Sequence, residues 1–211
     1  MKMITVENIS VSFGNEKIFD DFSFSLIKGQ KIAISGSSGM GKSTLLNVIL
    51  GFVPIEKGVI YVNNIVHSSE TIKQIRQNVA WLPQDLHLKL ETVDDLLFLP
   101  FSFALNRNNK PSDNEVEKML EELLLEKSIL RKKLDEISGG QKQRVALASQ
   151  LLLKKPLLLL DEPSSALDDV AQEAVLKIIS QNKELSVLSV SHNNKWLEKM
   201  DEVINLTKKD I

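Results

Sequence analysis

A glycine-rich segment near the N-terminus has the residue types and the spacing of a phosphate-binding loop. Residues 36–43 read Gly-Ser-Ser-Gly-Met-Gly-Lys-Ser, a full match to G-x-x-x-x-G-K-S/T. The segment follows a strand predicted at Lys31–Ser35 and opens a helix predicted at Lys42–Leu50, which is the context that this motif requires. Glycines let the backbone wrap closely around phosphate, while loop N–H groups and the helix N-terminus attract the anion. Lys42 can reach the terminal phosphates, and the Ser43 hydroxyl can join a Mg²⁺ shell.

A second segment with catalytic potential lies in the last third of the chain. Leu157–Leu160 is a continuous apolar run that ends at Asp161 and Glu162, as expected for a strand buried on both faces of a parallel sheet. Such a strand delivers its carboxylates to the C-terminal edge of the sheet, where α/β proteins bind ligands. Asp161 suits a metal ligand, and Glu162 beside it suits the activation of a water molecule. Together the two segments predict a domain that hydrolyses a nucleoside triphosphate.

The elements that must position these residues alternate between strands and helices at both ends of the chain. Strand patterns fall at residues 11–13, 22–26, 59–62, 79–82, 185–190 and 203–206, and a helical pattern falls at residues 169–180. From about residue 86 to residue 155 the pattern is helical, with capping-box spacing at Ser112 and Glu115. Strand–helix alternation around a helical insertion predicts an α/β fold with a mostly parallel sheet.

Length, charge and hydropathy limit the classes of protein to which this chain can belong. The chain has 211 residues, 43% of them hydrophobic, which suits a globular protein of one domain or of two very small ones. Lys and Arg number 26 against 28 Asp and Glu, so the basic excess that favours nucleic-acid binding is absent from the sequence. Cysteine is also absent, which excludes disulfides and thiol catalysis. The most apolar stretch, residues 151–160, is interrupted by Lys154, Lys155 and Pro156, so we expect no membrane span and a cytoplasmic protein.

A third motif points to one family. Residues 137–141 read Ile-Ser-Gly-Gly-Gln, which resembles the LSGGQ signature of ATP-binding cassette (ABC) proteins with Ile137 in place of Leu. Taken alone, a Ser/Gly segment of this kind would be an ordinary helix N-cap. Other landmarks follow in the order of that family: Gln84 resembles the Q-loop glutamine, Ser165–Asp168 the D-loop, and His192 the switch histidine. Phe13 stands where the family places an aromatic residue, usually Tyr, that stacks on adenine.

The resemblance covers nearly the whole chain and implies its organisation. It implies a single ATPase domain over residues 1–211, with a P-loop NTPase core formed by residues 1–85 and 156–211. This core would include a small antiparallel β part on the N-terminal side. An inserted helical subdomain, about residues 86–155, would carry the signature.

The resemblance also implies a shared site and its cofactors. Two copies, or one copy and a related cassette, would face each other head to tail with two ATP molecules between them. Nucleotide binding would fall to Phe13, Gly36, Ser37, Ser38, Gly39, Met40, Gly41, Lys42, Ser43, Thr44, Ser138, Gly139, Gly140, Gln141 and Asp168. Mg²⁺ would be held by Ser43 and Asp161 with help from Gln84, and catalysis would use Glu162, His192, Lys42 and Gln84.

Two functions of different class are compatible with this family. One is the ATPase subunit of a transporter, which would bind an integral membrane permease subunit at the cytoplasmic face of the cell membrane. The apolar run Leu96–Leu105 would then either help line the groove that receives the permease or pack as helix core. The alternative is a soluble ABC ATPase that acts on ribosomes or DNA. Such relatives usually carry two cassettes or long coiled-coil arms, so we expect the transporter subunit, without a nucleic-acid partner.

Overall fold

The centre of the molecule is a five-stranded parallel sheet. The computed structural model describes residues 1–85 and 89–207. The strands lie in the order β6-β7-β8-β3-β9 and every pair is parallel. Their bounds are β3 Lys31–Ser35, β6 Val79–Leu82, β7 Leu157–Asp161, β8 Ser186–Val190 and β9 Glu202–Asn205. All five residues of β7 are buried, as its apolar sequence predicts.

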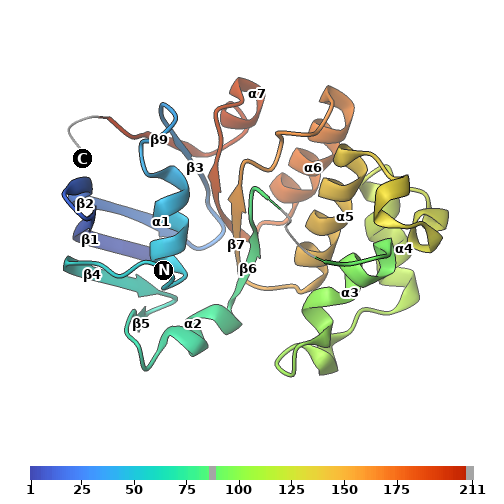
Figure 1. Cartoon of the computed structure of the whole chain (residues 1–211), viewed down its shortest axis with the longest axis horizontal. Helices are drawn as coiled ribbons and strands as arrows, with labels where there is room; N and C mark the ends of the chain where they lie inside the picture. The colour runs from blue at the N-terminus through green and yellow to red at the C-terminus, as the bar shows by residue number, and fades with distance from the viewer. Residues whose placement is uncertain (86–88, 208–211) are drawn as a thin grey trace.

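A smaller antiparallel sheet lies beside the central sheet, at the left of Figure 1. Its order is β2-β1-β4-β5, with β1 Lys2–Phe13, β2 Glu16–Ile27, β4 Lys57–Val62 and β5 Ile65–Val66. The helix α1, Lys42–Ile49, lies between the two sheets. The α/β fold predicted above, with a mostly parallel sheet and a small antiparallel β part, is therefore confirmed.

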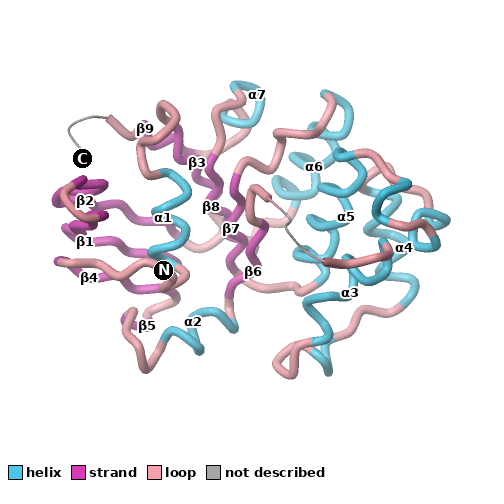
Figure 2. The backbone as a smooth tube through the Cα atoms, in the orientation of Figure 1, coloured by secondary structure: helices cyan, strands magenta, loops and turns pink. Residues whose placement is uncertain are grey.

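The other side of the central sheet is occupied by α3 Val93–Ser102, α4 Asp113–Glu122, α5 Gly139–Leu152 and α6 Asp169–Gln181 (Figure 2). Of the two shorter helices, α2 Ile72–Gln77 packs through Ile75 into the core around α1, and α7 Asn194–Leu197 follows β8. Residues 89–155 contain no strand beyond the isolated bridge between Thr92 and Lys133. This observation agrees with the predicted helical insertion, while the division into subdomains at residues 85 and 156 stays a prediction.

The strand β7 joins two hydrophobic cores. Leu157 and Leu159 pack into the core with α1 and the antiparallel sheet, while Leu158 and Leu160 pack into the core with the helical side. Because successive strand residues point to opposite faces, one apolar strand serves both cores. The residue that ends this strand, Asp161, is thereby held rigidly at the edge of the sheet.

Three short elements were not predicted from the sequence. The strand β5 and the helices α2 and α7 carry no clear periodic pattern, since they span only two, six and four residues. The apolar run from Leu96 to Leu105 also divides. Leu96 and Phe101 are buried core residues of α3, whereas Phe103 and Leu105, beyond the helix end, are exposed.

Candidate active site

The phosphate loop connects β3 to α1, as the sequence predicts. Gly41 precedes the first helical residue with φ of +77°, a left-handed conformation that glycine adopts without strain. A Cβ atom at this position would also collide with the side chain of Ile18. No side chain caps α1, so its first N–H groups are free to meet an anion. Lys42 Nζ donates to the carbonyl oxygens of Gly36 and Ser37, both at 2.9 Å, which holds the ammonium over the loop.

A cavity of about 770 Å³ opens beside this loop. It is lined by Phe13, Glu16, Ile18, Gly36, Ser37, Ser38, Gly39, Gly41, Lys42, Ser43, Thr44, Gln84, Glu162, Ser165 and His192. The structure thus brings together the predicted aromatic, the phosphate loop, the Q-loop glutamine and two predicted catalytic residues. Met40 is the exception within the loop, because its side chain packs against the hydrophobic core.

A pair of oxygen donors lies at the junction of α1 and β7. Ser43 Oγ donates a hydrogen bond of 3.0 Å to Asp161 Oδ1. Asp161 is only 7% exposed, and this burial raises the pKa of its carboxyl above the ordinary value. Among the described residues no group of three or more acidic, His or Cys side chains could hold a metal ion. Mg²⁺ needs no such group, since it is typically bound by one or two carboxylates, substrate phosphates and water. The hydroxyl and the carboxylate therefore fit a Mg²⁺ ion that arrives with a nucleotide.

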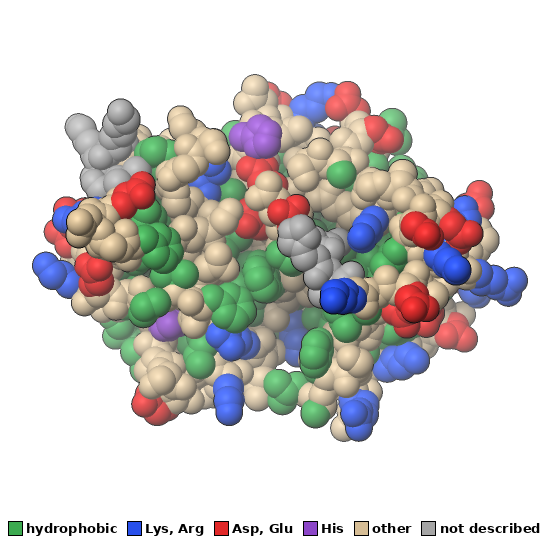
Figure 3. All heavy atoms as spheres, viewed as in Figure 1, with side chains coloured by type: hydrophobic (Ala, Val, Ile, Leu, Met, Phe, Trp, Pro, Cys, Tyr) green, Lys and Arg blue, Asp and Glu red, His purple; other side chains and the backbone are tan. Residues whose placement is uncertain are grey.

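Glu162 and His192 form the other polar pair of the cavity. His192 Nδ1 lies 3.0 Å from Glu162 Oε1, and His192 is largely exposed while Glu162 is buried. The Nδ1 atom also lies 3.0 Å from the second carboxylate oxygen, Oε2, which is buried and receives no hydrogen bond of its own among the described residues. A carboxylate whose two oxygens share one neighbour can still accept further hydrogen bonds. Since Glu162 lines the cavity, its carboxylate fits the activation of a water molecule there. A histidine and acidic side chains are visible together near α7 on this face (Figure 3).

The antiparallel hairpin supplies cavity residues that the sequence interpretation missed. Phe13, half exposed at the end of β1, pairs with Glu16 across the turn, and Ile18 follows on β2. Glu16 and Ile18 line the cavity beside Phe13. The short connection between two alternating apolar runs was a signal for this hairpin, from which both could have been inferred.

The signature lies outside this cavity in the single chain. Ser138 caps α5: its Oγ accepts from Gln141 N at 3.2 Å, and Gln141 Oε1 accepts from Ser138 N at 3.0 Å. The predicted D-loop residue Asp168 likewise caps α6 by accepting from Ala171 N at 2.8 Å. These predicted nucleotide ligands, with Gly139 and Gly140, do not line the cavity with the phosphate loop.

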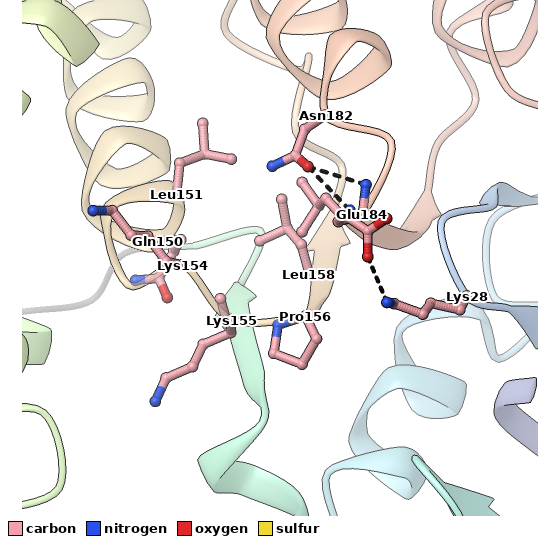
Figure 4. Close-up of a pocket in the computed structure, with 11 residues that line it drawn as sticks. Lys28, Gln150, Leu151, Lys154, Lys155, Pro156, Leu158, Asn182 and Glu184 are labelled. Atoms are coloured by element: carbon pink, nitrogen blue, oxygen red, sulfur yellow. Dashed lines mark hydrogen bonds and ion pairs between the residues drawn. The ribbon is translucent and has the colours of Figure 1, made fainter. Parts of the chain in front are cut away.

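A second cavity, of about 290 Å³, lies at the opposite end of β7 (Figure 4). Its lining combines apolar side chains, including Leu151 and Leu158, with three lysines. Two of these lysines form ion pairs, Lys28 with Glu184 and Lys154 with Glu115. None of the predicted site residues lines it, so the predicted catalytic residues that the structure brings together lie at the other cavity, at the carboxyl end of the strands.

Comparison with known proteins identifies the family of this chain. The family model described as ABC transporter matches residues 19–165. The thiamine import ATP-binding protein of Histophilus somni is 35% identical over 206 residues, covering 94% of this chain and 92% of its own length. The probable iron export ATP-binding protein of Escherichia coli is 33% identical over 207 residues, covering 97% of this chain and 91% of its own length.

A solved structure gives the same result at the level of the fold. The dimeric structure of a bacterial ABC transporter cassette superimposes with a TM-score of 0.85 and 26% identity, covering 97% of this chain and 94% of that one. The family match, the relatives and the fold therefore agree on one family. The chain belongs to the ABC transporter family, as an ATP-binding subunit that hydrolyses ATP.

Proposed function

We propose that ATP binds in the cavity beside the phosphate loop with its adenine ring on Phe13. The loop N–H groups and Lys42 would face the phosphates, and Ser43 with Asp161 would hold Mg²⁺, with help from Gln84. When bound, Mg²⁺ neutralises phosphate charge. The exposed face of Phe13 and the uncapped start of α1 support this orientation, because both line the same cavity.

Glu162 is the general base in this proposal. The single observation that carries this role is the buried Glu162 carboxylate on the wall of the cavity, where His192 Nδ1 lies 3.0 Å from both of its oxygens. An attacking water molecule would donate to this carboxylate. His192, hydrogen-bonded to Oε1 and largely exposed, would orient the carboxylate and contact the γ-phosphate.

The site is completed by a second copy in head-to-tail orientation. The signature residues Ser138–Gln141 lie at the start of α5, outside the cavity of their own chain. A helix N-terminus with a serine and two glycines suits phosphate binding, so the signature would close the site of the partner copy. The dimeric arrangement of the similar bacterial cassette supports this assembly.

The membrane part of the transporter is a separate permease subunit in this proposal. No helix among the described residues is long and apolar enough to cross a bilayer. The relatives are ATP-binding proteins of transport systems, which supports docking onto a permease at the cytoplasmic face of the membrane. The two relatives are named for thiamine import and iron export. Both names describe ATP-binding proteins of transport systems, but the transported substrate and the direction of transport differ.

Exposed apolar side chains in two segments support such docking. The Phe52 ring, half exposed, packs on Trp81 with centroids 5.5 Å apart, and Arg76 lies 4.5 Å above it. Phe103 and Leu105 are exposed beyond the end of α3. Copurification with an integral membrane protein would support the docking, whereas ATPase activity stimulated by RNA or DNA without a permease would contradict it.

The substitution Glu162→Gln tests the role of the base. It keeps the shape of the side chain and removes the negative oxygen, so we expect ATP binding to persist while turnover falls about 10²–10³-fold. ATP should then trap a dimer, measured by sedimentation velocity. Glu198→Gln, the same change on an exposed side chain of the following segment, is the matched control and should keep normal turnover. Normal turnover in Glu162→Gln would refute the assignment.

A further inference from the structure

A buried glutamine connects the signature helix to the catalytic segment of the same chain. Gln143 is the fifth residue of α5 and is 9% exposed. Its Nε2 donates a hydrogen bond of 3.1 Å to the carbonyl oxygen of Glu162. Its Oε1 accepts a hydrogen bond of 3.1 Å from the backbone N–H of Ala166. Both polar atoms of one amide are therefore used by the segment that carries the base and the D-loop.

The backbone held by this amide is strained. Glu162 has φ of +47°, in the left-handed region that residues with a side chain rarely adopt. A conformation of this kind persists only where the surroundings hold it. The Glu162 N–H donates to Val190 O at 2.9 Å, which fixes the segment to β8. The Glu162 carbonyl accepts from Gln143 Nε2 and from Ser165 N at 3.2 Å, which fixes its other side.

The start of α5 also lies against the D-loop. A Cβ atom on Gly140 would lie 2.6 Å from the carbonyl oxygen of Ala166, so only glycine allows this approach without a shift. The same turn of the helix is capped by Ser138, the serine of the signature, whose side chain is exposed. A displacement at the start of α5 would therefore be carried to Glu162 through Gly140 and Gln143.

We propose that Gln143 is a positioning residue that holds the Glu162 carboxylate at the attacking water and links it to the signature helix. This inference rests on the proposed role of Glu162 as general base. Gln143 does not line the cavity beside the phosphate loop. It lines a neighbouring cavity of about 320 Å³ with Gln84 and Ser165, and it contacts Glu162 through the backbone carbonyl. The role differs from plain core packing, since Leu147 and Val145 of the same helix are buried without polar contacts to this segment.

Two substitutions of Gln143 test the proposal. Gln143→Leu removes both hydrogen bonds, while Gln143→Glu keeps the shape and the acceptor for Ala166 N but cannot donate to the Glu162 carbonyl in its ionised form. For both we expect kcat for ATP to fall about 10–100-fold with little change in KM, because a small misplacement of a catalytic group affects turnover more than binding.

Gln150→Leu is the matched control. Gln150 lies on the same helix and lines the cavity at the opposite end of β7, and its Oε1 accepts from Trp81 N at 3.2 Å. We expect a similar loss of melting temperature in Gln150→Leu and Gln143→Leu, with kcat unchanged in Gln150→Leu only. Equal losses of kcat in the two variants would reduce Gln143 to a structural role and overturn the proposal.

A double-mutant cycle distinguishes the positioning role of Gln143 from a purely structural role. In the Glu162→Gln background, single-turnover hydrolysis of labelled ATP should be insensitive to Gln143→Leu, because Gln143 acts through the base that is already removed. An additive loss in the double variant would contradict the proposal. If Glu162→Gln itself has normal turnover, the role of the base fails. If it is inactive while both Gln143 variants have wild-type kcat, only the positioning role fails.

Discussion

At the scale of single residues, Lys42 carries the clearest prediction for ATP affinity. Its ammonium donates to two carbonyl oxygens of the phosphate loop and lines the cavity. We expect Lys42→Met to weaken ATP binding by about 10–100-fold, since charge-assisted hydrogen bonds contribute about 1.5–3 kcal/mol each. Titration with a fluorescent ATP analogue measures the affinity. Lys73→Met, the same change on an exposed lysine of α2, should leave it unaltered, and equal affinity in both variants would refute the role of Lys42.

The sequence predicted site residues best where a motif fixes the backbone. The phosphate loop lies between β3 and α1 as expected, because its glycines and its place between strand and helix leave few alternatives. The left-handed backbone of Glu162 was not predictable, since Glu has no preference for that conformation and only the contacts around it hold it. The two hydrogen bonds of Gln143 were equally inaccessible, because they depend on how α5 packs against residues 162–166.

At the scale of elements, the start of α4 makes a prediction about pH. Glu115 pairs with Lys154 and accepts from Ser112 N at 2.8 Å and Ser112 Oγ at 2.9 Å. The ion pair with Lys154, followed by the hydrogen bonds from Ser112, lowers the pKa of Glu115 from 4.5 to about 2. Because the folded-state pKa is depressed, the stabilisation is fully present above about pH 4.5 and is lost as pH falls toward about 2.

The variant Glu115→Gln isolates this contribution, because its amide still accepts a hydrogen bond but has no charge. We expect a lower melting temperature than that of the wild type at pH 7, with the difference shrinking as pH falls through the window given above. Glu121→Gln on the same helix is the control, since the Glu121 side chain makes no hydrogen bond or ion pair within the described ranges. A difference between wild type and Glu115→Gln that stays constant from pH 7 to acid would contradict the assignment.

Long and strongly periodic elements were predictable, whereas short ones were not. The strands β3 and β6 have the predicted bounds, and the capping box of α4 is present at Ser112 and Glu115. The four-residue helix α7 is different: it depends on Asn193, whose Oδ1 accepts from Trp196 N and from Gln172 Nε2. That contact with α6 joins segments that are distant in sequence, so no local pattern could have indicated it.

At the scale of the whole molecule, the central sheet contributes to two hydrophobic cores, and one of its edges borders the cavity. Alternate residues of β7 enter the core around α1 and the core of the helical side, and the strand ends at Asp161. The signature helix α5 packs with the second core, while the phosphate loop belongs to the first. In the proposed function one chain therefore has both halves of a phosphate site, but of the two only the phosphate loop lines the cavity beside α1.

Mixing two inactive variants tests whether the phosphate loop of one copy meets the signature of another copy. Lys42→Met damages the phosphate loop and Ser138→Arg damages the signature, so each variant alone should form two defective sites per head-to-tail dimer. A mixed dimer contains one site built from the intact phosphate loop of the Ser138→Arg copy and the intact signature of the Lys42→Met copy. We therefore expect the mixture to hydrolyse ATP faster than either variant at the same total concentration, measured by phosphate release. Were each site built within a single chain, the mixture would only average the two low rates, because no exchange of partners could then reunite an intact loop with an intact signature.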